Sequence, residues 1–147
     1  MKSVRTLILL ANEHDLRLLS HAGKGQPLVQ IAHHGAAEWA DATQRYSDRE
    51  GRMRNGPGPI SGLDRSTPER TQDRQHFAAH VLDITGTEWA TGHHDRLVIA
   101  APAKMLGQLR ATMPAELTRA LQGDLDANLL HLALDRLDDH LKNVIAL

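Results

Sequence analysis

The stretch HDRLVIAAPAKMLGQLR, residues 94–110, indicates the fold class most clearly. Its apolar run at 97–101 is too short for a helix and has no polar face, which is typical of a strand buried on both sides. Pro102 follows at once, and proline suits the first turn of a helix. Apolar residues then recur at helical spacing as far as Pro114. The stretch therefore predicts a buried strand, a tight turn and an amphipathic helix, which is the building unit of an α/β domain.

Composition indicates one domain without cysteine chemistry. The chain has 147 residues, a net charge of -1 and no cysteine, so disulfides, thiolate nucleophiles and cysteine-based metal sites are excluded. The nearly balanced charge does not point to nucleic acid or membrane. The apolar run at 7–11 is shorter than the apolar region of a usual signal peptide, and polar residues follow it directly. We therefore expect a cytoplasmic protein that does not cross a membrane.

Upstream of the central stretch, three short apolar runs predict strands at 4–11, 16–21 and 28–33. Short polar turns join them, and connections this short make neighbouring strands antiparallel. A helix is predicted to start near Ser66, which has capping-box spacing to Glu69, and to run to about residue 90. It should bury four apolar side chains against the sheet: Phe77, Val81, Ile84 and Trp89.

Downstream, Pro114 precedes a short turn of helix, and the pattern then predicts a fifth strand at 120–125 and an amphipathic helix at 134–144. The resulting order, βββ-loop-αβαβα, predicts an α/β fold with a five-stranded mixed sheet of ribonuclease-H-like appearance. We expect one domain over residues 1–147.

Residues 35–66 interrupt this order with a stretch rich in Gly, Pro, Ser, Asp and Arg. We expect a mobile, irregular loop, because so few apolar residues cannot bury enough surface to offset the entropy of ordering. Residues 45–74 hold seven arginines and five acids, a local excess of +2, whereas the rest of the chain carries -3. The loop is a candidate contact for RNA phosphates; the alternative is a solubilising surface loop. The candidate nucleic-acid-binding residues are Arg45, Arg49, Arg52, Arg54 and Arg70.

Four segments together resemble the small bacterial proteins named as required for attachment to host cells. They are Leu10-Ala11-Asn12 through Arg17-Leu18-Leu19, then Asp48-Arg49-Glu50-Gly51-Arg52, then Asp95-Arg96-Leu97-Val98 with Ala101-Pro102 and Leu106-Gly107, and last Asp126, Leu129, His131-Leu132 and the helix at 137–141. The chain departs from that family at Asn12-Glu13, where Asp-Gly is usual, and at Ala133-Leu134, where Pro-Pro is usual.

That family is similar in fold to the middle domain of archaeal and eukaryotic peptide-chain release factors. There, a Gly-Gly-Gln motif before the first helix promotes peptidyl-tRNA hydrolysis. When that domain's Arg-Phe-Ala is set on residues 76–78, Gln72 takes the place of its catalytic Gln, and Arg70 and Thr71 replace the glycines. The resemblance therefore implies a release-factor-like fold. Because the glycines supply the backbone freedom that presents the Gln, we expect no release activity.

Two groups of residues are candidate metal ligands. His76 and His80 lie four apart on one helix face, as a metal-binding pair would, but no third ligand accompanies them. Carboxylates near strand ends hold Mg²⁺ in ribonuclease-H-like nucleases. The acids concerned are Glu13, Asp15, Asp95 and Asp124 or Asp126. We expect them to lie at opposite ends of the sheet as solvated turn residues, and we assign no metal, cofactor or catalytic residue.

Three functions remain open. The favoured one is a non-enzymatic cytosolic binding protein that contacts RNA or the ribosome through the arginine-containing loop. The first alternative is an attachment-related protein that acts through protein partners. The second is a metal-dependent nuclease or hydrolase.

Overall fold

The computed structural model describes residues 4–35, 67–142 and 144, with the backbone alone for 67–71. Apart from its first residue, the loop predicted at about 35–66 therefore lies outside the described residues. The chain begins with three strands, β1 (Thr6–Ala11), β2 (Leu16–His21) and β3 (Leu28–His34). After them come α2 (Thr67–Trp89), β4 (Arg96–Ala101), α3 (Ala103–Thr112), α4 (Ala115–Ala120), β5 (Leu121–Asp126) and α5 (Leu134–Leu141).

The five strands form one mixed sheet in the order β3-β2-β1-β4-β5. β1 pairs antiparallel with β2, and β2 with β3, as the short turns predict. On its other side β1 pairs parallel with β4, and β4 pairs parallel with β5. This order and these directions are those of a ribonuclease-H-like fold, so the predicted α/β class is confirmed.

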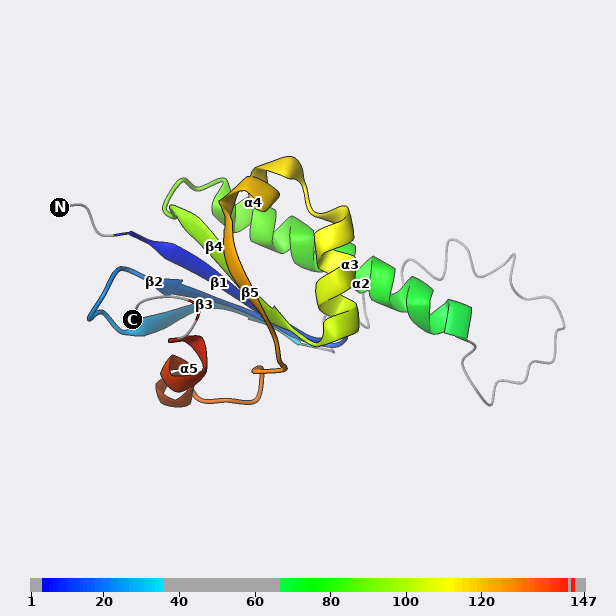
Figure 1. Ribbon diagram of the computed structural model, residues 1–147. Helices are drawn as coiled ribbons and strands as arrows, with labels where there is room; N and C mark the ends of the chain where they lie inside the picture. Colours follow the sequence, from blue (N-terminus) through cyan, green and yellow to red (C-terminus); the bar gives the residue numbers. More distant parts are fainter. Residues whose placement is uncertain (1–3, 36–66, 143, 145–147) are drawn as a thin grey trace, which may run out of the picture.

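The central strands β1 and β4 are buried because helices cover both faces of the sheet. All six residues of β1 are buried, as are all of β4 except Arg96, which explains their uninterrupted apolar runs. Figure 1 shows α2, α3 and α4 on one face and α5 on the other. Leu7, Phe77 and Leu109 belong to the core under the first group of helices, whereas Ile8 and Leu137 belong to the core under α5.

Several predicted boundaries are wrong by a few residues. The first strand begins at Thr6 rather than at residue 4, because Val4 lies beyond the sheet and is 44% exposed. β3 extends one residue further than predicted, and β5 begins and ends one residue later. The last helix ends at Leu141 rather than at Val144, although Val144 still packs against the core under α5.

The burial predicted for α2 is correct in its middle and wrong toward its C-terminus. Phe77 and Val81 are fully buried, whereas Ile84 and Trp89 are half-buried at the margin of the core. The reason is that α2 packs mainly on β1 and α3, whereas beside the edge strand β3 it leaves a groove between Ala32 and Ile84. Within the described ranges, no helix is long and apolar enough to cross a membrane.

Candidate functional site at the carboxyl end of the sheet

The carboxyl ends of β1, β4 and β5 meet at one end of the sheet, because these strands are parallel. Open α/β sheets usually have their binding sites at this end. β3 also ends here, since two antiparallel pairings make it parallel to β1. In Figure 1 the first turns of α2 project beyond this end of the sheet. We call this end of the sheet, with the turn after β1 and the first half of α2, the carboxyl end.

Asn12 organises the turn that follows β1. Its side-chain Oδ1 accepts hydrogen bonds from the backbone N–H groups of His14 and Asp15, each at 2.8 Å. Its own backbone N–H donates to the Asp15 carbonyl at 3.0 Å. An asparagine that bonds the backbone two residues on is a typical turn former, so the turn is held in one shape and presents Glu13 to solvent.

The turn is tied to α2 by an ion pair. Arg74 Nε donates to Glu13 Oε1 at 2.6 Å, with 15% of the Arg74 side chain and 44% of the Glu13 side chain exposed. Such a half-exposed pair contributes about 1 kcal/mol or less to stability. Its main effect is positional: it fixes the first half of α2 against the end of β1.

Histidines from β3 and α2 meet at the same end. The rings of His34 and His80 are edge-to-face with centroids 6.4 Å apart, and Phe77 lies 6.0 Å from His80. Beside them, a Cβ on Gly35 would stand 3.2 Å from Asp15 Oδ1, so glycine permits this close approach. The carboxyl end thus combines an acidic turn, imidazole rings and the cation of Arg74.

The predicted site residues fall partly within this region. Gln72 lies inside α2, about a turn and a half after the helix begins, and is partly buried. Arg70 belongs to the backbone of the same helix, and its side chain is outside the described part. The other four predicted residues, Arg45, Arg49, Arg52 and Arg54, lie outside the described residues.

The candidate carboxylates do not gather at one place. Glu13, Asp15 and Asp126 lie near the carboxyl end, whereas Asp95 precedes β4 at the opposite end, where its Oδ2 accepts from the Arg5 backbone N–H at 2.9 Å. Asp124 is paired with Arg110. Within the part of the chain that the structure describes, no group of three His, Cys, Asp or Glu residues could hold a metal ion.

The contacts of Arg17 were missed by the sequence analysis. Arg17 on β2 is 7% exposed; its Nε donates to Gln30 Oε1 at 2.8 Å, and its Nη1 donates to the carbonyls of Leu130 and Leu132 at 3.1 and 2.7 Å. Burial lowers the pKa of its guanidinium, yet an arginine remains charged at neutral pH. A lone arginine between the buried Leu16 and Leu18 was the available signal, but its partners on the β5–α5 connection have no sequence signature.

Comparison with known proteins decides the family. The model of bacterial archaeo-eukaryotic release factor family 12 matches residues 5–141. The chain belongs to this family. The predicted resemblance of this family 12 protein to release factors is confirmed. The predicted resemblance to host-attachment proteins stays a prediction. No curated protein matches the chain.

Among solved structures, the family 12 protein is similar to the PPX-GPPA enzyme of Aquifex aeolicus. The sequence identity is 12% and the TM-score is 0.36. The similarity covers 83% of this chain and 35% of that enzyme, so the chain corresponds to about a third of the enzyme's length.

Proposed function

We propose that this family 12 protein is a non-enzymatic, cytoplasmic binding protein that contacts RNA, free or within the ribosome, through arginines that precede and begin α2. The supporting observation is membership of a release-factor family over residues 5–141, a span that includes all of these arginines. Proteins that act in translation meet RNA phosphates, and arginine is well suited to bind them.

The distribution of charge agrees with this proposal. Residues 45–74 carry an excess of +2 in a chain of net charge -1. Arg74 is engaged by Glu13, so the proposed contacts are assigned to five of the six arginines before it in this stretch: Arg45, Arg49, Arg52, Arg54 and Arg70. The Arg74–Glu13 ion pair ties α2 to the β1–β2 turn, so the helix that Arg70 belongs to is joined to the folded domain.

Peptidyl-tRNA hydrolysis is not part of the proposal. Gln72 corresponds to the release-factor glutamine, yet it lies within the regular helix α2. Arg70 and Thr71, which replace the two glycines, are helical as well. A helical backbone fixes the dihedral angles of these residues, which supports the expectation of no release activity, because the release-factor motif depends on the backbone freedom of its glycines.

The proposal is tested by RNA binding measured as fluorescence anisotropy at several salt concentrations. Four phosphate contacts predict that log affinity falls with log salt with a slope of about three to four. Changing Arg45, Arg49, Arg52 and Arg54 together to Gln should remove most of this slope and leave the melting temperature within a few degrees. A matched control changes four exposed cations elsewhere to Gln: Lys24, Lys104, Arg119 and Arg136.

Two outcomes contradict the proposal. One is the absence of RNA binding at low salt, and the other is equal slopes for the two fourfold variants. Ribosome co-sedimentation of the same variants distinguishes ribosomal from free RNA. If the loop arginines prove necessary for capturing a protein and not for binding RNA, the alternative of an attachment-related role through protein partners replaces the proposal.

A further inference from the structure

The edge strand β3 has an open hydrogen-bonding side and carries no charged side chain. Among the described strands, β3 stands at one end of the sheet and pairs with β2 alone, so alternate peptide groups face away from the sheet. Among the described residues, no backbone hydrogen bond outside the ladder to β2 involves residues 28–33 of β3. Its sequence, LVQIAHH, contains no Lys, Arg, Asp or Glu, which are the side chains that commonly block such edges.

Apolar side chains are exposed on this same strand. Val29 is 52% exposed and Ile31 is 39% exposed. Ile31 is the unpaired residue of a bulge, since Gln30 and Ala32 pair with consecutive residues of β2. Among the described residues, the one other exposed large hydrophobic side chain is Val4. An unpaired edge with two exposed branched side chains is suited to an added strand.

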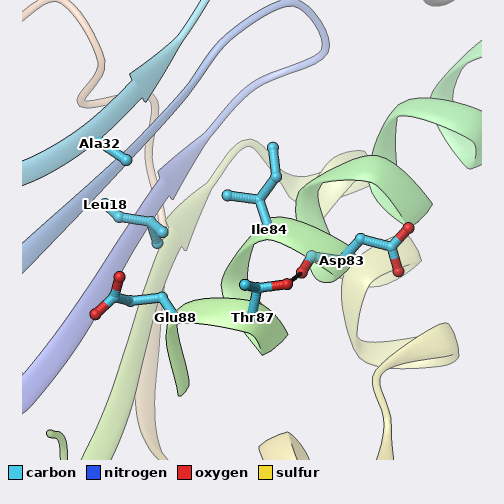
Figure 2. Close-up of a pocket in the computed structure, with 6 residues that line it drawn as sticks. All are labelled: Leu18, Ala32, Asp83, Ile84, Thr87 and Glu88. Carbon is cyan, nitrogen blue, oxygen red and sulfur yellow. Dashed lines mark hydrogen bonds between the residues drawn. The ribbon is translucent and has the colours of Figure 1, made fainter. Parts of the chain in front are cut away.

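A groove runs beside this edge, between β2, β3 and the second half of α2. Its apolar side chains are Leu18, Ala32 and Ile84, and Figure 2 shows Ile84 pointing from α2 toward the other two. The groove exists because α2 meets β3 at His34 but does not close over Ala32, which also leaves Ile84 half-buried. It therefore offers pockets for alternate side chains of a strand that lies along β3.

The groove has an acidic margin. Glu88 and Asp83 both line it; in Figure 2 the Glu88 carboxylate lies on the strand side of α2 and the Asp83 carboxylate points outward. Neither forms an ion pair with a described residue. A segment that lies in the groove is thus favoured when it carries positive charge next to its apolar residues.

We propose that β3 and this groove bind an extended, apolar peptide segment of a partner protein with basic residues beside its apolar ones, which adds to the sheet as a sixth strand. The open peptide groups of β3 favour an extended backbone. Val29, Ile31 and the groove favour apolar side chains at alternate positions of the peptide. Glu88 favours a Lys or Arg beside them. This surface is separate from the carboxyl end, because it lies along the opposite half of α2 from Gln72.

A fluorescein-labelled nine-residue peptide, Lys-Thr-Val-Thr-Val-Thr-Val-Thr-Lys, is the probe, and anisotropy is measured with the whole chain. We expect saturable binding, with amide resonances of β3 shifting in heteronuclear NMR spectra. Glu88→Lys should raise the Kd about tenfold, since one contact becomes repulsive. Glu116→Lys on α4, an exposed acid with the same charge change, should leave the Kd unchanged. Replacing the central valine of the peptide by proline should abolish binding, because the strand loses a backbone donor.

Three results overturn the proposal. The first is no binding at millimolar peptide, and the second is an equal Kd for Glu88→Lys and Glu116→Lys. The third is dimerisation of the protein that Val29→Lys prevents, which would assign the edge to a second copy of this chain. Val29 is more than half exposed, so the Val29→Lys variant should fold. If the proposal is correct, this variant binds the peptide more weakly than the wild type does, and the wild type is monomeric.

Discussion

Replacing Arg17 by Met should destabilise the domain severely, although Arg17 is a single charged residue on a strand. Met keeps most of the apolar stem but removes the donors to Gln30 and to the carbonyls of Leu130 and Leu132. Hydrogen bonds to a charged group contribute roughly 1.5–3 kcal/mol each. Three of them would give about 4.5–9 kcal/mol. The free-energy cost of removing the guanidinium from water must be subtracted from this sum. We therefore expect a loss of about 3–5 kcal/mol in the free energy of unfolding.

Urea unfolding followed by circular dichroism measures this loss, which is large against a typical stability of about 5–15 kcal/mol. Arg136→Met on the exposed face of α5 is the matched control, and it should change stability by about 0.5 kcal/mol or less. Arg17→Lys should be intermediate, because it keeps the charge but cannot reach three acceptors at once. A loss below about 1 kcal/mol for Arg17→Met, or one equal to that of the control, would refute the assignment of Arg17 as the tie between β2 and the β5–α5 connection.

Three further predictions concern the core, the chemistry and the pH dependence. Val98→Asp should abolish soluble folding, because Val98 is 0% exposed in the central strand β4 and an unpaired buried carboxylate costs several kcal/mol; expression and thermal melting measure this. The protein should not cleave peptidyl-tRNA, and Gln72→Ala should leave that baseline unchanged in a release assay. Stability should fall as the pH is lowered below about 6.5. Burial lowers the pKa of His21 and His94 in the folded protein. Below about pH 6.5 the unfolded chain therefore binds more protons than the folded one. The stability present at neutral pH is then lost as the pH falls through the folded-state pKa values.

Each of these predictions has a contradicting result. A soluble Val98→Asp protein that melts cooperatively would show that β4 is not central. Cleavage of peptidyl-tRNA by the wild type that is lost in Gln72→Ala would show that the protein has release activity. A free energy of unfolding that is the same at pH 7 and pH 5 would contradict the burial of the two neutral imidazoles. His21 is the more informative position for the pH test, because it is 0% exposed.

Local patterns predicted most of the elements, because they depend on signals within a few residues. The run at 97–101 predicted a doubly covered strand, and Leu97 to Ala101 are all 0% exposed. Pro102 is the N-cap of α3, one residue before the place where the pattern put it. The prediction for α2 was less good at Ile84 and Trp89, because helical spacing shows which face is apolar but not how far the sheet extends beneath it.

The candidate site was predicted less well, because its contacts join residues far apart in the sequence. The Arg74–Glu13 ion pair spans 61 residues and the Arg17–Leu132 bond spans 115. Neither pair has a spacing that chain periodicity could reveal. Glu13 was considered as a possible Mg²⁺ ligand, whereas the structure uses it to hold α2.

The position of β1 in the sheet has a consequence for how the protein is made. β1 pairs with β2 almost at once, but its other neighbour is β4, and Thr6 lies beside Arg96, 90 residues later. At synthesis rates of about 5–20 residues per second, a strand of six buried residues waits roughly 5–20 seconds for the partner that covers its second edge. During that interval the nascent chain presents an apolar, hydrogen-bonding edge to its surroundings, so ribosome-bound chaperones should engage it before residue 101 has emerged.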